Sequence, residues 1–360
     1  MAIANIPKIK IGDLEVTLVQ GGMGVGVSGH GLSSAVAEEG GAGIIASACL
    51  GVHKNYPGDY AKANSDALRD EIRAARKKTN GVIGVNIMHV LSDYSTLVET
   101  AVEENVDLII SGAGIPKDLP RYLNGKNIKL VPIVSSARVA DIMCKAWSKL
   151  GHIPDAIVVE GPKAGGHLGY SIEQLSDSRF VSRGLEEILL PEIITAVKPY
   201  ENSNKKIPII AAGGIFYGGD IARVNRLGAA GVQMATRFVT TYECDADIRF
   251  KETYLNSKKE DTVIIQSPVG MPGRAIKDPF LEEVKIRRAD FGCNYQCLKS
   301  CNPSTSPYCI AHALVEAQQG RFGEGFVFCG SNAYLCKEIV SVKELFSMLE
   351  DEYAQGKLSD

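Results

Sequence analysis

The sequence predicts an α/β fold, namely a (β/α)8 TIM barrel with a cysteine-containing C-terminal extension. Three observations support this prediction: eight short apolar runs, helical patterns between them, and polar or glycine-rich motifs directly after them. Near-continuous apolar runs are typical of parallel strands that are covered on both faces. Strand–helix alternation over about 250 residues matches a closed barrel. An open doubly wound sheet remains the alternative, because periodicity does not show whether the sheet closes.

The expected strands are short and rich in Val, Ile and Ala. They cover residues 16–20, 42–47, 82–87, 106–110, 128–134, 155–159, 207–212 and 230–235. The clearest helical pattern covers 65–78, where Leu68, Ile72 and Ala75 share one face and charged residues occupy the other. Similar patterns predict helices over 141–150, 185–197 and 219–227.

The regular alternation stops after residue 257. Residues 258–310 hold a charged stretch, a segment rich in proline and glycine, and a cysteine cluster. We expect a helix over 310–319 and a final amphipathic segment over 342–353. The predicted division is therefore a barrel domain (1–257) and an extension packed on it (258–360).

The composition narrows the class of protein and its partners. The 360 residues carry a formal net charge of −3, which gives no electrostatic case for a nucleic-acid partner. No segment approaches the roughly 20 apolar residues of a membrane span, and the N-terminus lacks a secretory apolar region. We therefore expect a cytoplasmic protein without membrane contact that acts on a small molecule, and a homodimer is compatible with the sequence.

The motifs after the strands would meet at one rim of the barrel, where the active sites of this fold lie. After the seventh and eighth strands, Gly213, Gly214 and Thr236 offer backbone N–H groups and a hydroxyl for a phosphate. The simpler interpretation is that the glycine pair only turns the chain. After the first and third strands, Gly22, Met23 and Asn86 offer close backbone approach, soft packing and a hydrogen-bonding amide to a flat ring, or merely a tight turn.

The most informative segment is EGPKAGGHLGY, residues 160–170. It follows a buried strand and surrounds His167 with three glycines, two of which directly precede it. A histidine just past a strand end can transfer a proton near neutral pH. A lone histidine is more often structural, but the other five histidines lack this context. We therefore predict a catalytic role for His167.

Four of the nine cysteines form a cluster. Cys293, Cys297, Cys301 and Cys309 are separated by three, three and seven residues. Four thiolates can bind zinc or an iron–sulfur cluster, but this spacing lacks the C-x2-C pattern of such sites. Reduced structural cysteines are the preferred interpretation, and a metal site or a disulfide are the alternatives.

Taken together and in this order, six motifs resemble the nitronate monooxygenase family, formerly called 2-nitropropane dioxygenases. The same superfamily includes the flavin-dependent enoyl-acyl-carrier-protein reductase of the second type. The resemblance covers roughly residues 8–275. It rests on VQGGMG, GVNIM, SGAG, EGPKAGGHLG, IPIIAAGGI and GAAGVQMATRF.

The resemblance implies an FMN-binding barrel with His167 at the substrate face. The cofactor-binding residues would be Gly22, Met23, Asn86, Glu160, Gly165, Gly166, Gly213, Gly214, Gln233, Ala235 and Thr236. Lys163 stands where family members carry a glutamate, which is a reversal of charge near the site.

The resemblance implies oxidation of alkyl nitronates with O2 to carbonyl compounds and nitrite. The first alternative is an NAD(P)H-dependent reductase of an enoyl thioester, in which Lys163 and Arg237 would favour a phosphorylated cofactor or an acyl carrier. The second is a phosphate-binding barrel that uses no flavin.

Overall fold

Eight parallel strands form a closed barrel at the centre of this computed structural model, which describes residues 6–203, 205–289, 291–293 and 295–359. Their order in the sheet is β3-β11-β10-β8-β7-β6-β5-β4. The barrel closes because Val19 also pairs with Ala42, where Gln20 N–H donates to the Ala42 carbonyl over 3.0 Å. The strands are β3 (Val19–Gln20), β4 (Gly43–Ala46), β5 (Ile83–Met88), β6 (Leu108–Gly112), β7 (Lys129–Val134), β8 (Ile157–Glu160), β10 (Ile209–Ala212) and β11 (Gly231–Met234). The predicted closed barrel is therefore confirmed.

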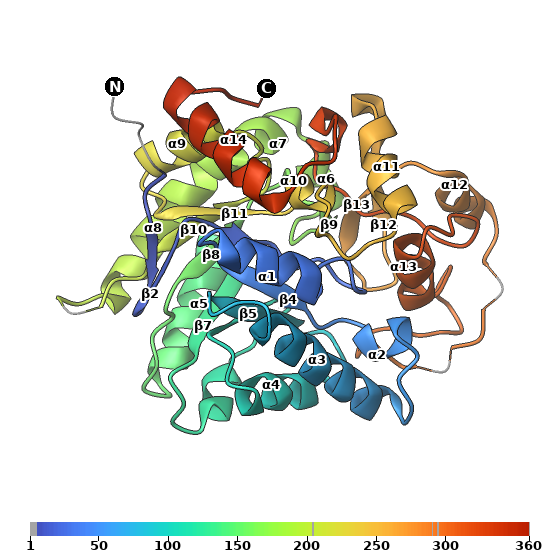
Figure 1. The fold of residues 1–360 in the computed structure, drawn as a ribbon, viewed down its shortest axis with the longest axis horizontal. Helices are drawn as coiled ribbons and strands as arrows, with labels where there is room; N and C mark the ends of the chain where they lie inside the picture. Colours follow the sequence, from blue (N-terminus) through green and yellow to red (C-terminus); the bar gives the residue numbers. More distant parts are fainter. Residues whose placement is uncertain (1–5, 204, 290, 294, 360) are drawn as a thin grey trace.

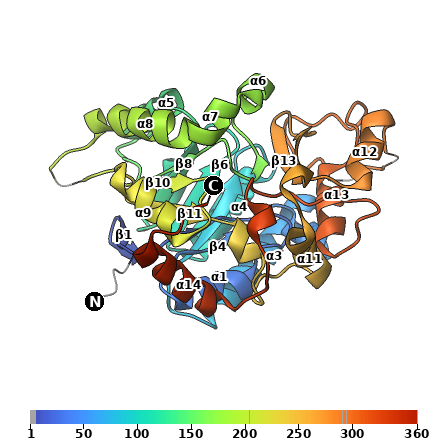
Figure 2. The same ribbon diagram turned by 90° about the horizontal axis from the view of Figure 1, so that it is seen from above.

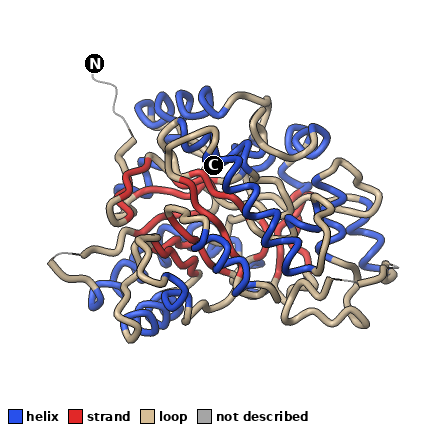
Figure 3. Tube along the Cα trace, turned by 60° about the horizontal axis from the view of Figure 1, so that its bottom comes forward, coloured by secondary structure: helices blue, strands red, loops and turns tan. Residues whose placement is uncertain are grey.

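Helices surround these strands (Figures 1 and 3). They include α1 (His30–Glu38), α3 (Tyr60–Arg76), α4 (Tyr94–Glu103), α5 (Ala137–Ser148), α8 (Leu190–Val197), α9 (Gly218–Arg226) and α14 (Val342–Gln355). The predicted helices are confirmed, although α3 begins five residues before the predicted start at residue 65. Asp59 fixes that start, because its side chain accepts a hydrogen bond from Lys62 N–H.

Two barrel helices, α1 and α4, were not predicted. Helix α4 (YSTLVETAVE) contains two threonines and two valines, which have low intrinsic helix propensity. It forms because Leu97, Val98 and Ala101 are fully buried against the neighbouring strands and helices. Tertiary packing therefore outweighs local propensity here.

A short hairpin fills the interior at the N-terminal end of the barrel. It consists of β1 (Ile9–Ile11) and β2 (Leu14–Val16), and Ile9, Ile11 and Val16 join the interior apolar cluster with Val19 and Ile210. The predicted first strand, 16–20, is therefore divided between β2 and β3.

The extension contains sheet structure where we expected loops. Strand β13 (Pro272–Ile276) pairs with β12 (Thr262–Gln266) on one side and with β9 (Gly166–His167) on the other, both antiparallel. These strands were not predicted, because Pro272 and Gly273 at the start of β13 are atypical of a strand and the pairing of β13 with β9 joins segments about 100 residues apart.

The remaining helices are short or belong to the loops and the extension. They are α2 (Leu50–His53), α6 (Ile172–Ser176), α7 (Ser178–Arg183), α10 (Thr236–Val239), α11 (Ile248–Asn256), α12 (Pro279–Ile286) and α13 (Ile310–Gln318). Figures 1 and 2 both show α12 and α13 beside β13, at one side of the barrel. Helix α14 instead packs against α9 and α1. The division at residue 257 stays a prediction, and its outer ends (1–5 and 360) lie outside the described residues. Within the described part, every helix is too short or too polar to span a membrane.

Candidate active site

A cavity of about 470 Å³ opens at the carboxyl ends of the barrel strands. Residues that follow all eight strands line it, as the convergence of the strand-end motifs predicts. Every residue predicted as catalytic or cofactor-binding lies in its lining: Gly22, Met23, Asn86, Glu160, Gly165, Gly166, His167, Gly213, Gly214, Gln233, Ala235 and Thr236. The structure therefore brings the predicted residues together.

Glycines in the lining allow segments of backbone to approach one another closely. A Cβ atom on Gly22 would lie 2.5 Å from the Asn86 Cβ, and one on Gly165 would lie 2.6 Å from the Cys329 backbone carbon. Gly213 has a φ of +91°, and its Cβ would lie 2.8 Å from the Gly161 carbonyl oxygen. Only glycine fits at these positions. We call the backbone that Gly22, Gly165 and Gly213 contribute to the cavity lining the cradle.

The polar groups of the cradle include one without a partner. The Gln233 Oε1 atom is buried, and no group among the described residues hydrogen-bonds to it. An unsatisfied buried oxygen costs free energy unless a ligand or water donates to it. Gln233 is therefore a candidate for contact with a ring N–H of a ligand.

Segments from the C-terminal part hold Gly214 in place. Its carbonyl accepts hydrogen bonds from Asn332 Nδ2 at 3.0 Å and from Ser359 Oγ at 3.3 Å. Lys163 also lines the cavity, and a Cβ on Gly214 would lie 2.8 Å from Lys163 Cδ. Burial, and then the nearby Arg223 charge, lowers the pKa of Lys163.

The suggestion that Arg237 serves a phosphorylated ligand was wrong. Arg237 is buried and does not line the cavity. Its guanidinium forms an ion pair with Glu352 of α14 at 2.7 Å and donates to the Phe216 carbonyl at 3.3 Å. It therefore fixes the C-terminal helix to the barrel.

His167 lies where the rim meets the extension. Its Nε2 is 2.7 Å from Ser267 Oγ, and its ring makes an edge contact with Phe328, with centroids 4.9 Å apart. Burial lowers the pKa of His167 to about 4, so the imidazole is neutral at pH 7. Ser267 was not predicted from the sequence, because it lies 100 residues away in the chain and no local motif marks it.

The pKa of Glu160 is raised, whereas that of His167 is lowered. Burial raises its pKa to about 7, and a Gly169 backbone hydrogen bond and the Arg274 charge oppose this effect. Arg274, on β13, is itself buried and donates to the Ala164 carbonyl. The extension therefore places the Arg274 cation beside the Glu160 carboxyl at the end of β8, and Arg274 was not predicted from the sequence either.

The cluster of four cysteines was the weaker alternative prediction, that of a metal site. Among the described residues, which include all four, no group of three or more His, Cys, Asp or Glu side chains is arranged to hold a metal ion. All four thiols are free, and Cys297 lines the cavity together with Cys49. A hydrogen bond with the Cys49 thiol, and then burial, raises the pKa of the Cys297 thiol.

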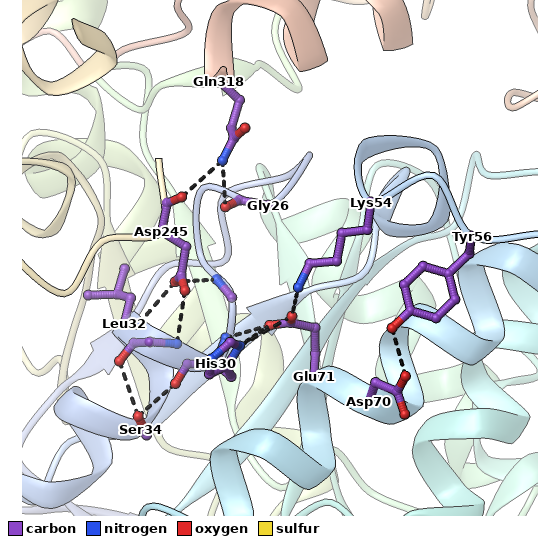
Figure 4. A network of polar contacts seen from close by, with 12 residues as sticks. Gly26, His30, Leu32, Ser34, Lys54, Tyr56, Asp70, Glu71, Asp245 and Gln318 are labelled. Carbon is purple, nitrogen blue, oxygen red and sulfur yellow. Dashed lines mark hydrogen bonds and ion pairs between the residues drawn. The ribbon is translucent and has the colours of Figure 1, made fainter. Parts of the chain in front are cut away.

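The loop after β3 is fixed by a polar network (Figure 4). The Asp245 carboxylate accepts from the N–H groups of Gly29, Gly31 and Leu32, so the N-terminus of α1 is already capped. Gln318 of α13 donates to the carbonyls of Gly26 (3.2 Å) and Asp245 (3.0 Å). The extension thus holds the loop that contributes Gly22 and Met23 to the cavity.

Comparison with known proteins agrees with this geometry. The model of the family described as nitronate monooxygenase matches residues 5–96 and 88–352. A Mycobacterium tuberculosis protein, (3aS,4S,5R,7aS)-5-hydroxy-7a-methyl-1-oxo-octahydro-1H-indene-4-carboxyl-CoA dehydrogenase, is 30% identical over 279 residues, which cover 78% of this chain and 68% of that protein.

Two further proteins are similar. A probable nitronate monooxygenase of Staphylococcus aureus is 27% identical over 313 residues, with 77% of this chain and 79% of the relative covered. The solved structure of FabK from Thermotoga maritima superposes with a TM-score of 0.74 and 28% identity, and covers 96% of this chain and 94% of that one. The matched residues extend beyond the predicted 8–275 into the extension. The chain therefore belongs to the nitronate monooxygenase family and is an oxidoreductase of that family.

Proposed function

We propose that the protein is an FMN-dependent oxidoreductase that oxidises alkyl nitronates with O2 to carbonyl compounds and nitrite. The observation that carries this proposal is the neutral His167 imidazole, which is hydrogen-bonded to Ser267 and lines the same cavity as the glycines at the strand ends. The matching family model and the S. aureus relative support the same reaction class.

The residues present fit FMN. The unpartnered Gln233 Oε1 would accept a ring N–H, and the cavity of about 470 Å³ leaves room for a flat ring beside the glycines that line it. Gly22 and Met23 would lie along the isoalloxazine, Asn86 and Gln233 at its polar edge, and Gly213, Gly214, Ala235 and Thr236 at the phosphate. When bound, FMN would supply the electron transfer from the nitronate to O2.

His167 would act on the substrate itself. A neutral imidazole can donate its N–H to a nitro oxygen, or accept the α-proton if the substrate arrives as a neutral nitroalkane. The hydrogen bond with Ser267 fixes the ring, which removes the entropy cost of orienting it at each turnover. Burial keeps the imidazole unprotonated down to about pH 4, so it remains available as an acceptor through the physiological range.

A second candidate is the NAD(P)H-dependent reduction of an enoyl thioester. The specific observation in its favour is that the extension adds an apolar wall to the cavity, against which an acyl chain would fit. This wall consists of Val269, Met271, Leu298, Ile310, Leu314 and Phe328. The relative whose name describes a carboxyl-CoA dehydrogenase acts on a thioester and supports this reading. In that reaction His167 would assist protonation of the α-carbon.

Two assays on the purified holoprotein separate these reactions. Nitrite release from an alkyl nitronate in air, without NAD(P)H, is expected if the first proposal holds. Rapid anaerobic bleaching of the flavin by NADPH, without nitrite release, would favour the second. A colourless protein that cannot be reconstituted with FMN would contradict both and favour a barrel that binds phosphate without flavin.

A further inference from the structure

Two thiols meet at the cavity, one from the barrel and one from the extension. Cys49 lies between β4 and α2, and Cys297 belongs to the cysteine cluster of the extension. Both thiols are free and buried, and both line the cavity. A hydrogen bond joins their side chains. A disulfide forms only between cysteines whose side chains approach each other, and this pair meets that condition.

Hydrogen bonds hold the two segments that carry these thiols around a buried carboxylate. In α2, the Gly51 N–H donates to Asn64 Oδ1 over 2.8 Å, and Asn64 Nδ2 donates to Asp93 Oδ2 over 2.8 Å. The neighbouring Ser92 N–H donates to the Cys297 carbonyl over 3.1 Å. The helix that follows the first thiol and the segment that carries the second are therefore both fixed to the loop of Ser92 and Asp93.

The surroundings of Cys49 provide a second connection between the same segments. Its backbone has a φ of +58°, in the left-handed region that side chains rarely adopt, so surrounding contacts must hold it there. Its Sγ lies 3.5 Å from the Tyr60 hydroxyl, and the Tyr60 ring packs against Tyr295 of the extension with centroids 6.1 Å apart. Tyr295 precedes Cys297 by two residues, so this contact also places the extension at Cys49.

Asp93 offers a proton acceptor to the thiol pair. Its Oδ1 atom is buried, and no group in the described part of the chain hydrogen-bonds to it. Burial raises the pKa of Asp93 to about 6, so the side chain is a carboxylate at pH 7 and above. A hydrogen bond with Cys49 and burial raise the pKa of the Cys297 thiol, and the Asp93 charge adds to this effect. The Cys297 thiol is therefore protonated at neutral pH, and the carboxylate can take its proton when an oxidant reacts.

We propose that Cys49 and Cys297 form a reversible disulfide at the cavity when the protein meets hydrogen peroxide. Asp93 takes the Cys297 proton, the sulfur attacks one peroxide oxygen, and the O–O bond breaks to give a sulfenic acid and hydroxide, which Asp93 reprotonates to water. The Cys49 thiol then attacks the sulfenic sulfur, and the S–S bond forms as a second water leaves. Two thiols thus lose two electrons and two protons, and peroxide is reduced to two waters.

This pair is a modification site separate from the proposed reaction. Hydrogen peroxide is small enough to reach buried thiols through the cavity that they line. No step of the disulfide formation uses a flavin or a nitronate, so the inference does not depend on the proposed function. The new bond would attach the extension covalently to the barrel beside the candidate active site.

Thiol counting and peptide mapping test the proposal on the purified, fully reduced protein. After treatment with a small excess of hydrogen peroxide, titration in denaturant should show that two of the nine thiols are lost, and dithiothreitol should restore them. Mass spectrometry of the digested protein should find the Cys49 peptide linked to the Cys297 peptide. Nine remaining thiols, or a disulfide that joins a different pair such as Cys297 and Cys309, would overturn the proposal.

Serine variants assign the pair. Cys49→Ser and Cys297→Ser should each prevent the paired loss of thiols, and in Cys49→Ser the sulfenic-acid reagent dimedone should label Cys297. The matched control is Cys144→Ser, because Cys144 is fully buried in α5 and does not line the cavity; this variant should still lose two thiols. A Cys49→Ser protein that also loses two thiols would contradict the assignment. If a variant fails to fold, the peptide map of the parent protein still decides.

Discussion

The rim of the barrel and the wall of the extension face the same cavity, but the sequence encodes them differently. The rim residues lie in short motifs directly after strands, and close backbone packing demands glycine at Gly22, Gly165 and Gly213. The wall is assembled from single apolar residues spread over about sixty positions, each of which could serve in any core. Site residues whose type is fixed by chemistry or close packing can therefore be predicted from local sequence motifs. A surface that needs only apolar side chains cannot, because apolar residues occur throughout the core.

The largest expected effect comes from destroying the cradle. Gly213→Val should abolish flavin binding, because a side chain at a φ of +91° is strained and its Cβ would lie 2.8 Å from the Gly161 carbonyl oxygen. The ratio of flavin to protein absorbance measures this. Gly151→Val is the control, since Gly151 also has a positive φ (+72°) but has no atom within 4 Å of a Cβ. Equal flavin content in both variants would mean that the cradle is not the cofactor site.

The next effect concerns chemistry rather than binding. His167→Ala should keep its flavin and lower turnover on the order of 10²-fold or more, because it removes the only imidazole that lines the cavity within the described chain. His312→Ala, which alters an exposed histidine paired with Glu324, should leave turnover unchanged. Activity of His167→Ala within a factor of two of the parent would remove His167 from the mechanism.

A smaller expected effect on turnover tests whether Ser267, which belongs to the extension, orients His167 at the barrel rim. Ser267→Ala should lower kcat about tenfold with little change in KM or flavin content, because the His167 ring loses its 2.7 Å hydrogen bond and is less well oriented. Ser267→Thr keeps the hydroxyl and should restore most of the rate. If both variants behave alike, the hydroxyl does not position the ring, and the two regions are less closely coupled than the structure indicates.

The smallest effect is a pH dependence of stability. The His167 pKa is about 4 in the folded protein and near 6.5 when unfolded, so between these values the unfolded chain binds more protons. The contribution of His167 to the free energy of unfolding of the apoprotein should therefore fall as pH drops from 6.5 towards 4, by roughly 2 kcal/mol at pH 5 relative to pH 8, and it is opposed by Glu160, whose pKa is raised to about 7. His167→Gln should lack this part of the dependence. Chemical denaturation at each pH gives the free energy of unfolding of both proteins. If this free energy changes with pH by the same amount in the parent and in His167→Gln, the prediction is wrong.

The sequence predicted the eight barrel strands and all residues of the cradle, because apolar runs and strand-end glycines are local signals. It did not predict α4, whose threonines and valines favour a helix only once Leu97 and Val98 are buried. It also missed Ser267 and Arg274, because they reach His167 and Ala164 through the pairing of β13 with β9, more than 100 residues earlier in the chain. The role of Arg237 was predicted wrongly, because the sequence does not show whether an arginine after the last strand binds a phosphate or forms an ion pair with Glu352.

The central claim is that the rim holds FMN with a neutral imidazole facing the substrate. Its most direct test is the visible spectrum of the purified protein, or of the protein reconstituted with FMN, during anaerobic addition of an alkyl nitronate. We predict an oxidised flavin spectrum that is reduced by the nitronate and restored by air with release of nitrite. A protein that takes up no FMN, or a bound flavin that the nitronate leaves oxidised, would contradict it.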